Sequence, residues 1–307
     1  MAHDRITQPS AIEEVADLDV ESLDLAVTIV MPALNEAAHI GEGIREVQTV
    51  LQGSQWGFEI IVVDDGSSDG TAAAAAETGV RVLRHRTNRG YGASLKKGIS
   101  EAKYGWVLIT DADGTYPADA IPSLLARAVD NDMVVGARTG ATVRVPWVRR
   151  PAKWFLRKLA GYLAGRRLPD LNSGLRLMRK DLVDQYAHLL PPGFSFTTTI
   201  TLASTCNGHQ VEYVPIDYRA RLGQSKIRPW HAYEFTLLIL RTIVFFNPLK
   251  VFIPLGAVLA LAGIGKFIYD ITRNNLSESA IFAMLAALIV WAVGLLADQN
   301  SRIAMNR

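Results

Sequence analysis

Two aspartates stand one residue apart just after a short apolar run, and their spacing fits a metal site. The run covers residues 107–109, and Asp111 and Asp113 flank Ala112 soon after it ends. Apolar β-forming residues predict a buried strand, and ligands in open α/β sheets bind at the carboxyl ends of strands. Mg²⁺ typically takes one or two carboxylates and fills its other positions with phosphate oxygens and water. Taken alone, the pair also fits a solvated Asp-rich turn, which is the more ordinary interpretation.

Two other loops have the composition of phosphate-binding segments. Residues 218–229 are rich in cations and small residues, among them Arg219, Arg221, Ser225 and Lys226. Arginine offers a phosphate a planar fork of donors, and lysine offers a compact charge. A solvated basic loop is the alternative. Glycines within residues 90–92 could turn backbone N–H groups towards a phosphate at a helix start, although a tight turn without a ligand fits the spacing equally well.

The chain around these residues alternates strands with helices, which predicts an α/β fold with a mostly parallel, right-handed wound sheet. The first strand is expected to stop at Pro32, and Asp69 is expected to cap a helix. No Gly-x-Gly-x-x-Gly follows the first strand and no Walker-type loop occurs, which argues against dinucleotide and P-loop sites. Strands are expected at residues 26–31, 58–63, 80–84, 107–109, 133–135, 172–178 and 210–218, and helices at residues 35–51, 69–77, 93–103, 118–129, 181–190 and 198–208.

Apolar segments near the C-terminus predict contact with a membrane. Residues 251–271, which include Lys266, and residues 280–297 are long enough to span a bilayer as a hairpin. Residues 147–167 and 229–247 are expected to lie at the membrane interface, the first as a basic helix rich in aromatic residues. The alternative for the spans is a buried soluble hairpin. A solvated surface helix, or more weakly nucleic-acid binding, is the alternative for the basic segment.

These features divide the chain into an acidic flexible arm (residues 1–24), an α/β domain (25–228), an interfacial helix (229–247) and a two-helix anchor (248–307). The distribution of Lys and Arg around the spans predicts that the large domain and both termini face the cytoplasm, at a cytoplasmic or endoplasmic reticulum membrane. The single cysteine, Cys206, excludes an intramolecular disulfide and a cysteine-based metal site.

Several motifs follow one another in an order that is more specific than any one of them alone. They are Pro32, Asn35 and Glu36, then residues 62–71, 88–93, 111–113, 135–138, 170–176 and 223–226. Together they resemble the family-2 glycosyltransferases with a GT-A-type fold, and more narrowly the dolichol-phosphate mannose synthase and polyprenyl-phosphate glycosyltransferase branch. The resemblance covers about residues 27–228, and the two-helix anchor also occurs in that branch. It implies a GT-A-type wound, mostly parallel sheet, followed by interfacial amphipathic helices and a two-helix transmembrane hairpin.

The resemblance also implies a role for individual residues. Asp111 and Asp113 would hold Mg²⁺ or Mn²⁺ on the diphosphate of a nucleotide-sugar, and Asp113, Asp170 and Arg138 are the candidate catalytic residues. Donor and acceptor phosphates would be held by Arg138, Arg219, Arg221, Ser225 and Lys226. The donor would be bound by Pro32, Leu34, Glu36, Val63, Asp64, Asp65, Asp111, Ala112, Asp113 and Thr115.

The class of acceptor can be argued from the residues themselves. A hydroxyl acceptor needs a general base, usually a carboxylate, whereas a phosphate is already ionised and needs only cations to position it. Residues 194–201, where hydroxyl-using relatives often carry an acid, have none. The basic loop lies just before the membrane segment, where a lipid phosphate would arrive. Both facts favour a lipid phosphate, with Asp170 as the fallback base or as a structural residue.

We therefore expect metal-dependent, inverting transfer of one sugar from a GDP- or UDP-linked donor to polyprenyl or dolichyl phosphate. Transfer to a lipid hydroxyl, such as that of a diacylglycerol or ceramide, is one alternative, and a non-catalytic nucleotide-binding membrane scaffold is another. The Gln-x-x-Arg-Trp motif of processive synthases is missing, which disfavours a chain-extruding enzyme. Residues 114–117 depart from the Leu-Gln-His-Pro of many mannose synthases, so the sugar is not predicted. No nucleic-acid partner is expected, and a homo-oligomer is left open.

Overall fold

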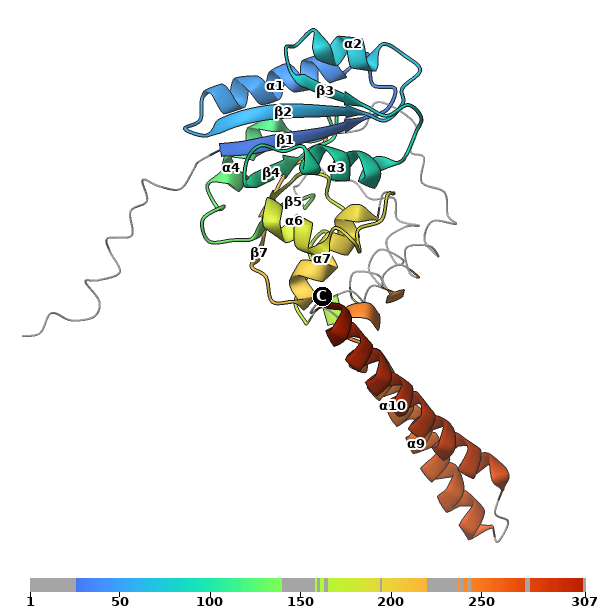
Figure 1. Ribbon diagram of the computed structural model, residues 1–307. Coiled ribbons are helices and arrows are strands. Elements are labelled where there is room, and N and C mark those ends of the chain that lie inside the picture. Colours follow the sequence, from blue (N-terminus) through green and yellow to red (C-terminus); the bar gives the residue numbers. More distant parts are fainter. Residues whose placement is uncertain are drawn as a thin grey trace, which may run out of the picture.

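The protein combines an α/β domain with a long pair of apolar helices (Figure 1). The computed structural model describes residues 26–139, 158, 161–162, 165–193, 195–219, 237, 240–241, 244–273 and 277–305. The acidic arm and most of the segments 147–167 and 229–247 lie outside the described residues. The expectations for those three segments therefore stay predictions.

One seven-stranded sheet forms the centre of the α/β domain, with strand order β3-β2-β1-β4-β6-β5-β7. Strand β6 runs antiparallel to β4 and β5, and all other neighbours are parallel. The expected mostly parallel sheet is thus confirmed, with one reversed strand that the sequence did not predict. The strands are β1 (Ala26–Ala33), β2 (Gly57–Asp64), β3 (Arg81–Arg84), β4 (Trp106–Ile109), β5 (Met133–Ala137), β6 (Arg176–Arg179) and β7 (Val211–Pro215).

Strand β1 continues through Pro32, where we expected it to stop. Pro32 pairs with Val63 of β2, whereas the last pair between β1 and β4 is Val30 with Ile109. Proline is tolerated in a sheet where its missing N–H costs no ladder hydrogen bond. Pro32 lies beyond the pairing with β4, so the strand can extend past it towards the loop that follows.

Helices cover both faces of the sheet, and two of them start later than expected. Asn35 has a φ of 57°, so the chain turns through a left-handed conformation before α1 begins at Ile40. Helix α2 begins at Thr71, and its N-cap is Gly70 rather than the expected Asp69, although Asp69 accepts a hydrogen bond from the Thr71 backbone N at 3.0 Å. The helices are α1 (Ile40–Gln52), α2 (Thr71–Ala76), α3 (Tyr91–Ser100), the 3₁₀ turn η2 (Ala118–Ala120), α4 (Ile121–Leu125), α6 (Lys180–Tyr186) and α7 (Phe196–Cys206).

Successive side chains of the central strands enter two separate hydrophobic cores. In β1, Ile29 and Met31 pack in the core that α1 and α4 cover, whereas Val30 packs in the core that α3, α6 and α7 cover. In β4, Leu108 belongs to the first core and Ile109 to the second. Burial of both faces explains why these strands are continuously apolar.

Gly98 sets how closely α3 approaches the sheet. A Cβ at this position would lie 2.3 Å from Cγ1 of Val30 and 3.1 Å from Cγ2 of Val63. We expect Gly98→Ala to destabilise the domain by about 1–3 kcal/mol, because overpacking a core outweighs the helix propensity that alanine adds. Thermal unfolding in detergent measures the effect. Gly105→Ala is the matched control, because a Cβ there has nothing within 4 Å, and equal midpoints for the two variants would contradict this packing account.

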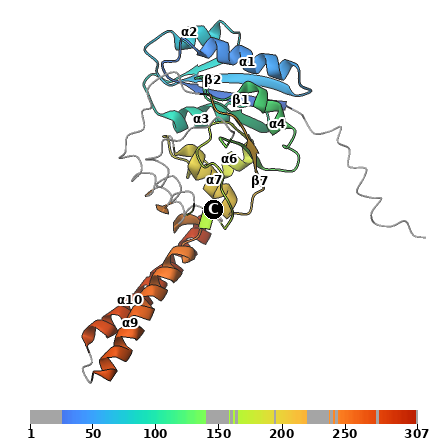
Figure 2. The ribbon, with the colours of Figure 1, turned by 180° about the vertical axis from the view of Figure 1, so that it is seen from behind.

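Helices α9 (Leu249–Thr272) and α10 (Glu278–Met305) lie side by side and extend away from the α/β domain in both views (Figures 1 and 2). They approach closely at glycines: a Cβ on Gly256 would lie 2.2 Å from the indole nitrogen of Trp291. The ammonium of Lys266 contacts Asp270 and Ser277 near the connection between the helices. Both helices are long and apolar enough to cross a membrane, and only 11% and 17% of their most apolar windows is buried in the protein. That exposure disfavours the alternative of a buried soluble hairpin.

Candidate functional site

The carboxyl end of β4 presents Asp111 and Asp113, and each carboxylate has a fixed hydrogen-bond donor. Oδ1 of Asp111 accepts a hydrogen bond from the hydroxyl of Tyr91 at 2.9 Å. Oδ1 of Asp113 accepts one from the Thr115 backbone N at 3.1 Å and one from its hydroxyl at 2.6 Å. Thr115 itself is buried. The two side chains are therefore oriented by the protein rather than extended into solvent.

This donor set fits a hard divalent cation. Carboxylate oxygens are the ligands that Mg²⁺ and Mn²⁺ prefer, and ligating carboxylates are usually held by hydrogen bonds from neighbouring groups. Over the described part of the chain, no three or more His, Cys, Asp or Glu residues are grouped as a metal site. Two carboxylates suffice for an ion that takes its remaining ligands from phosphate oxygens and water.

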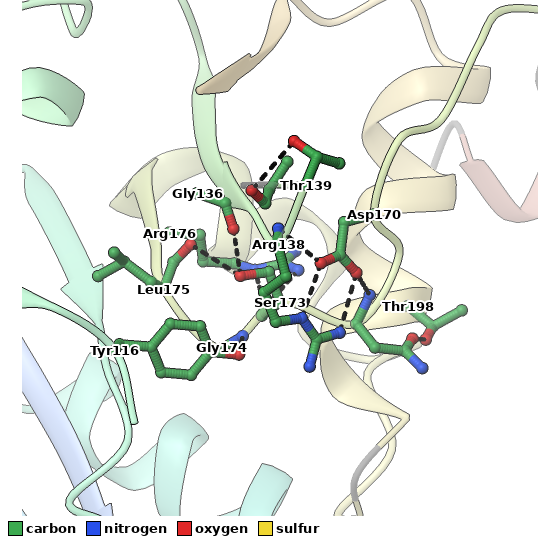
Figure 3. Close-up of polar contacts among 12 residues, drawn as sticks. Tyr116, Gly136, Arg138, Thr139, Asp170, Ser173, Gly174, Leu175, Arg176 and Thr198 are labelled. Atoms are coloured by element: carbon green, nitrogen blue, oxygen red, sulfur yellow. Dashed lines mark hydrogen bonds and ion pairs between the residues drawn. The ribbon is translucent and has the colours of Figure 1, made fainter. Parts of the chain in front are cut away.

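A turn before β6 packs directly against Asp111. A Cβ on Gly174 would lie 2.9 Å from both carboxylate oxygens of Asp111, so only glycine lets the main chain come this close. The backbone N of Gly174 donates to the hydroxyl of Tyr116 at 2.6 Å, a contact that Figure 3 shows. Burial raises the pKa of Tyr116, with the nearby charge of Asp111 adding to the effect. Tyr116 therefore stays a neutral hydroxyl beside the acidic pair.

Arg138, directly after β5, forms a bidentate ion pair with Asp170 (Figure 3). Its Nε lies 2.7 Å from Oδ2 and its Nη2 2.9 Å from Oδ1, while its backbone N also donates to Oδ2 at 3.1 Å. Burial alone would raise the pKa of Asp170, but the hydrogen bonds and charge of Arg138 outweigh burial and lower it. The Arg138 guanidinium also lies over the ring of Tyr218, 5.4 Å from its centroid. Asp170 is thus an ionised partner that fixes the direction of Arg138.

Arg176 at the start of β6 is fully buried, and sequence reasoning gave it no role of its own. Its Nε and Nη2 donate to the carbonyl of Ser173 at 3.1 and 2.7 Å, and its Nη1 donates to the carbonyl of Thr197 at 3.0 Å and the hydroxyl of Thr201 at 2.9 Å. Burial lowers the pKa of Arg176, as expected for a cation removed from water. An arginine between two leucines was the signal that could have revealed it.

The second acidic pair, Asp64 and Asp65, lies at the end of β2 and organises the loops around it. Asp64 is fully buried, with Ser67 N donating to its Oδ1 at 3.0 Å and Arg84 Nε 3.0 Å from its Oδ2. Asp65 receives His85 Nδ1 at 2.7 Å and the backbone N of Arg89 and of Gly90, each at 2.8 Å. Although burial opposes the shift, these hydrogen bonds lower the pKa of Asp65.

The other predicted donor-binding residues lie at the ends of β1 and β2, which adjoin in the sheet, except for Ala112, which follows β4. Glu36 donates its backbone N to the hydroxyl of Thr71 at 2.9 Å, which ties the loop after β1 to the start of α2. Leu34 is half-buried, whereas the side chains of Val63 and Ala112 lie in the cores. Val63 and Ala112 could therefore meet a ligand only through their main chain.

Glycines 90 and 92 serve packing in this structure, which favours the tight turn over a phosphate cradle. The backbone N of Gly90 is used by Asp65, and that of Ala93 donates to the Pro192 carbonyl at 2.9 Å. A Cβ on Gly92 would lie 2.3 Å from the carbonyl oxygen of Pro191. The turn thus holds the start of α3 against residues 191–193.

The start of the cationic loop lies beside the acidic pair of β4. The backbone N of Arg219 donates to the Thr115 carbonyl at 3.0 Å, two residues from Asp113. The Arg219 guanidinium, which is largely exposed, lies 3.3 Å from Glu46 of α1. The remaining predicted phosphate-binding residues, Arg221, Ser225 and Lys226, lie outside the described residues. The structure therefore brings together the carboxylates, Arg138, Asp170 and the beginning of the loop at one edge of the sheet.

Two family models match the chain. Residues 28–187 match the model described as glycosyl transferase family 2, and residues 247–303 match the model described as GtrB C-terminal hairpin. The first match runs from β1 to the end of α6 and includes both acidic pairs, Arg138 and Asp170. The second covers α9 and most of α10. The family named from the motifs is thereby confirmed.

Two similar proteins act on lipid phosphates according to their names. A dolichyl-phosphate hexose transferase of Haloferax volcanii is 30% identical over 209 residues, covering 67% of this chain and 88% of that protein. An undecaprenyl-phosphate 4-deoxy-4-formamido-L-arabinose transferase of an Enterobacter species is 27% identical over 304 residues, covering 90% of this chain and 88% of that protein. Because the second match covers 90% of this chain, it includes at least part of the apolar hairpin.

Solved structures support the fold assignment. Glucosyl-3-phosphoglycerate synthase from Mycobacterium tuberculosis, solved with Mn²⁺, UDP and phosphoglyceric acid, matches with a TM-score of 0.57 and 21% identity, over 71% of this chain and 78% of that chain. The same synthase with Mn²⁺ and UDP-glucose gives a TM-score of 0.57 at 20% identity, over 71% and 79% of the two chains. At these identities the likeness establishes the architecture alone.

Proposed function

The chain belongs to glycosyl transferase family 2, and from that premise we propose that it transfers one sugar from a nucleotide-sugar to a polyprenyl phosphate. The reaction would be metal-dependent and inverting, and it would take place at the cytoplasmic face of the membrane that α9 and α10 cross. The relatives named for dolichyl and undecaprenyl phosphate support this acceptor, because one of them aligns with 90% of the chain.

The contact between Thr115 and Arg219 carries the proposal. It joins the loop that orients Asp113 to Arg219, the first arginine of the cationic loop, which precedes the apolar hairpin in the sequence. A donor diphosphate on the carboxylates and a lipid phosphate arriving from the membrane would therefore meet at this edge of the sheet. Two anionic reactants need cations between them, and the chain supplies Arg138 and Arg219 there.

The chain's own residues would position the reactants. Asp111 and Asp113, fixed by Tyr91 and Thr115, would hold Mg²⁺ or Mn²⁺, which neutralises charge on the departing diphosphate when it is bound. Asp170 holds the Arg138 guanidinium by two parallel hydrogen bonds, so that Arg138 would present its charge to a phosphate without reorganisation. The acceptor phosphate would attack as an ionised oxygen.

The lowered pKa of Asp170 also bears on the acceptor. A general base works best with a pKa near the working pH, and a buried carboxylate whose two oxygens accept from Arg138 is far from that condition. The alternative of a lipid hydroxyl acceptor, for which Asp170 was the fallback base, is therefore less well supported. A non-catalytic scaffold is also disfavoured, because Asp64, Asp65, Asp111 and Asp113 are all present at strand ends.

Purified protein in detergent, incubated with polyprenyl phosphate and Mg²⁺ or Mn²⁺ across a panel of GDP- and UDP-sugars, tests this proposal. We expect one donor to yield a sugar–phosphate–lipid, detected by mass spectrometry, and chelation with EDTA to abolish the product. The Asp113→Asn protein is the matched control for contaminating activity. No glycolipid across the full panel would overturn the proposed reaction, and undiminished product with EDTA would overturn the metal dependence.

A further inference from the structure

Tyr91 reaches Asp111 from the start of α3, and the chain on both sides of it is fixed. Before it, the backbone N of Gly90 donates to Asp65. After it, the close approach of Gly92 to Pro191 and the hydrogen bond from Ala93 to the Pro192 carbonyl hold the first turn of α3 in place. The Tyr91 hydroxyl is thus delivered to Oδ1 of Asp111 by a backbone that has little freedom to move.

Arg176 holds the stretch of main chain that contacts the same carboxylate. Two of its N–H groups donate to the carbonyl of Ser173, and the next residue, Gly174, is the one that packs against both oxygens of Asp111. Figure 3 shows Arg176, Ser173 and Gly174 together beside the Arg138–Asp170 pair. The guanidinium is itself held by Thr197 and Thr201 of α7. Arg176 therefore determines where the 173–174 main chain lies.

We infer that Tyr91 and Arg176 are positioning residues that together set the orientation of the Asp111 carboxylate for its metal. Neither needs to touch a substrate. A phenylalanine at position 91 would fill nearly the same volume without burying a hydroxyl. Burial of the Tyr91 hydroxyl costs free energy, and its hydrogen bond to Asp111 offsets that cost. Groups that orient a metal-ligating side chain typically change metal affinity or activity by about 10- to 100-fold when they are removed.

The inference rests on the proposed role of Asp111 as a metal ligand, and it is tested by metal binding rather than by transfer. Mn²⁺ is titrated into the full-length protein with UDP or GDP present, and free Mn²⁺ is measured by electron paramagnetic resonance. Tyr91→Phe removes only the hydroxyl. Thr201→Val removes one of the acceptors that hold Arg176.

Each variant has a matched control. Tyr104→Phe makes the same change just before β4, at the opposite end of that strand from Asp111 and Asp113. Thr205→Val makes the same change one turn further along α7, where the Thr205 hydroxyl bonds to the Thr201 carbonyl at 2.6 Å. Thermal unfolding midpoints are recorded for all four variants, so that a loss of fold is recognised directly.

We expect Tyr91→Phe to weaken Mn²⁺ binding by about tenfold or more, and Thr201→Val to weaken it by a smaller factor, with both controls binding as the parent does. Tyr91→Phe and Thr201→Val proteins that are folded and bind Mn²⁺ as tightly as their controls would overturn the inference. A parent protein that binds no Mn²⁺ with either nucleotide would overturn it together with the metal assignment. Intact Mn²⁺ binding without any glycolipid product would count against the proposed acceptor alone.

Discussion

Asp113→Asn is expected to lower sugar transfer by about 10²- to 10³-fold while leaving the fold intact. A bound divalent ion is worth several kcal/mol of charge stabilisation in the transition state, and each 1.36 kcal/mol changes the rate tenfold. Asparagine keeps the shape of the side chain and can still accept the two hydrogen bonds from Thr115. It loses the negative charge that a metal requires. Initial rates at saturating Mg²⁺ or Mn²⁺ measure the effect.

Asp119→Asn is the matched control for this prediction. Asp119 lies in η2, only a few residues further along the same connection, and its side chain is exposed. Rates for this control should equal those of the parent, because removing a solvated charge outside the site changes neither the metal nor the fold. An Asp113→Asn protein as active as the Asp119→Asn protein would remove Asp113 from the metal site.

Asp170→Asn is expected to destabilise the domain by about 3 kcal/mol at neutral pH. Removing one partner of a buried ion pair leaves the other charge uncompensated, which typically costs 3–5 kcal/mol. Asp170 is 5% exposed and Arg138 is 22% exposed, which places this pair at the lower end of that range. Asp181→Asn is the control, because Asp181 and Arg179 are 70% and 50% exposed and such pairs contribute less than about 1 kcal/mol.

The pH dependence of this loss follows from the lowered pKa of Asp170. A carboxylate with a pKa depressed below its ordinary value of 3.8 stabilises the folded state above that value and loses this contribution as the pH falls through the folded pKa. The stability gap between the parent and Asp170→Asn should therefore be constant from neutral pH down to about 3.8 and close below it. Chemical unfolding at several pH values measures the gap.

The same variant separates the two roles considered for Asp170. If the residue positions Arg138, Asp170→Asn loses stability and turnover together, and the pH–rate profile of the parent shows no limb from this carboxylate. A variant that keeps full stability but loses turnover would contradict the ion-pair account. That result would restore Asp170 as a base and, with it, the lipid hydroxyl as acceptor.

Features set by local pattern could be predicted from the sequence. Residues 107–109 are apolar and residues 58–63 are apolar except for Glu59, and these β-forming runs make up most of β4 and β2, with aspartates at the carboxyl ends. Both strands run parallel to β1, so Asp64, Asp65, Asp111 and Asp113 lie at the same edge of the sheet. The two apolar spans could also be predicted, since α9 and α10 contain the predicted segments.

Features set by tertiary contact could not be predicted. The reversed direction of β6 depends on pairing with both β4 and β5, which no local periodicity records. The bidentate pair of Arg138 and Asp170 joins residues 32 positions apart, and the contact of Gly174 with Asp111 depends on where that reversed strand begins. The role of Arg176 could not be predicted for the same reason, because Thr197 and Thr201 of α7, which hold its guanidinium, are distant in the sequence.

The central claim is that a lipid phosphate, and not a lipid hydroxyl, receives the sugar. The most direct test offers the purified protein equal amounts of a polyprenyl phosphate and the corresponding polyprenol, with the productive nucleotide-sugar and Mg²⁺ or Mn²⁺, and identifies the products by mass spectrometry. We predict that the sugar appears only on the phosphate-bearing lipid and that this product disappears with Asp113→Asn. Glycosylated polyprenol as the main product would contradict the account.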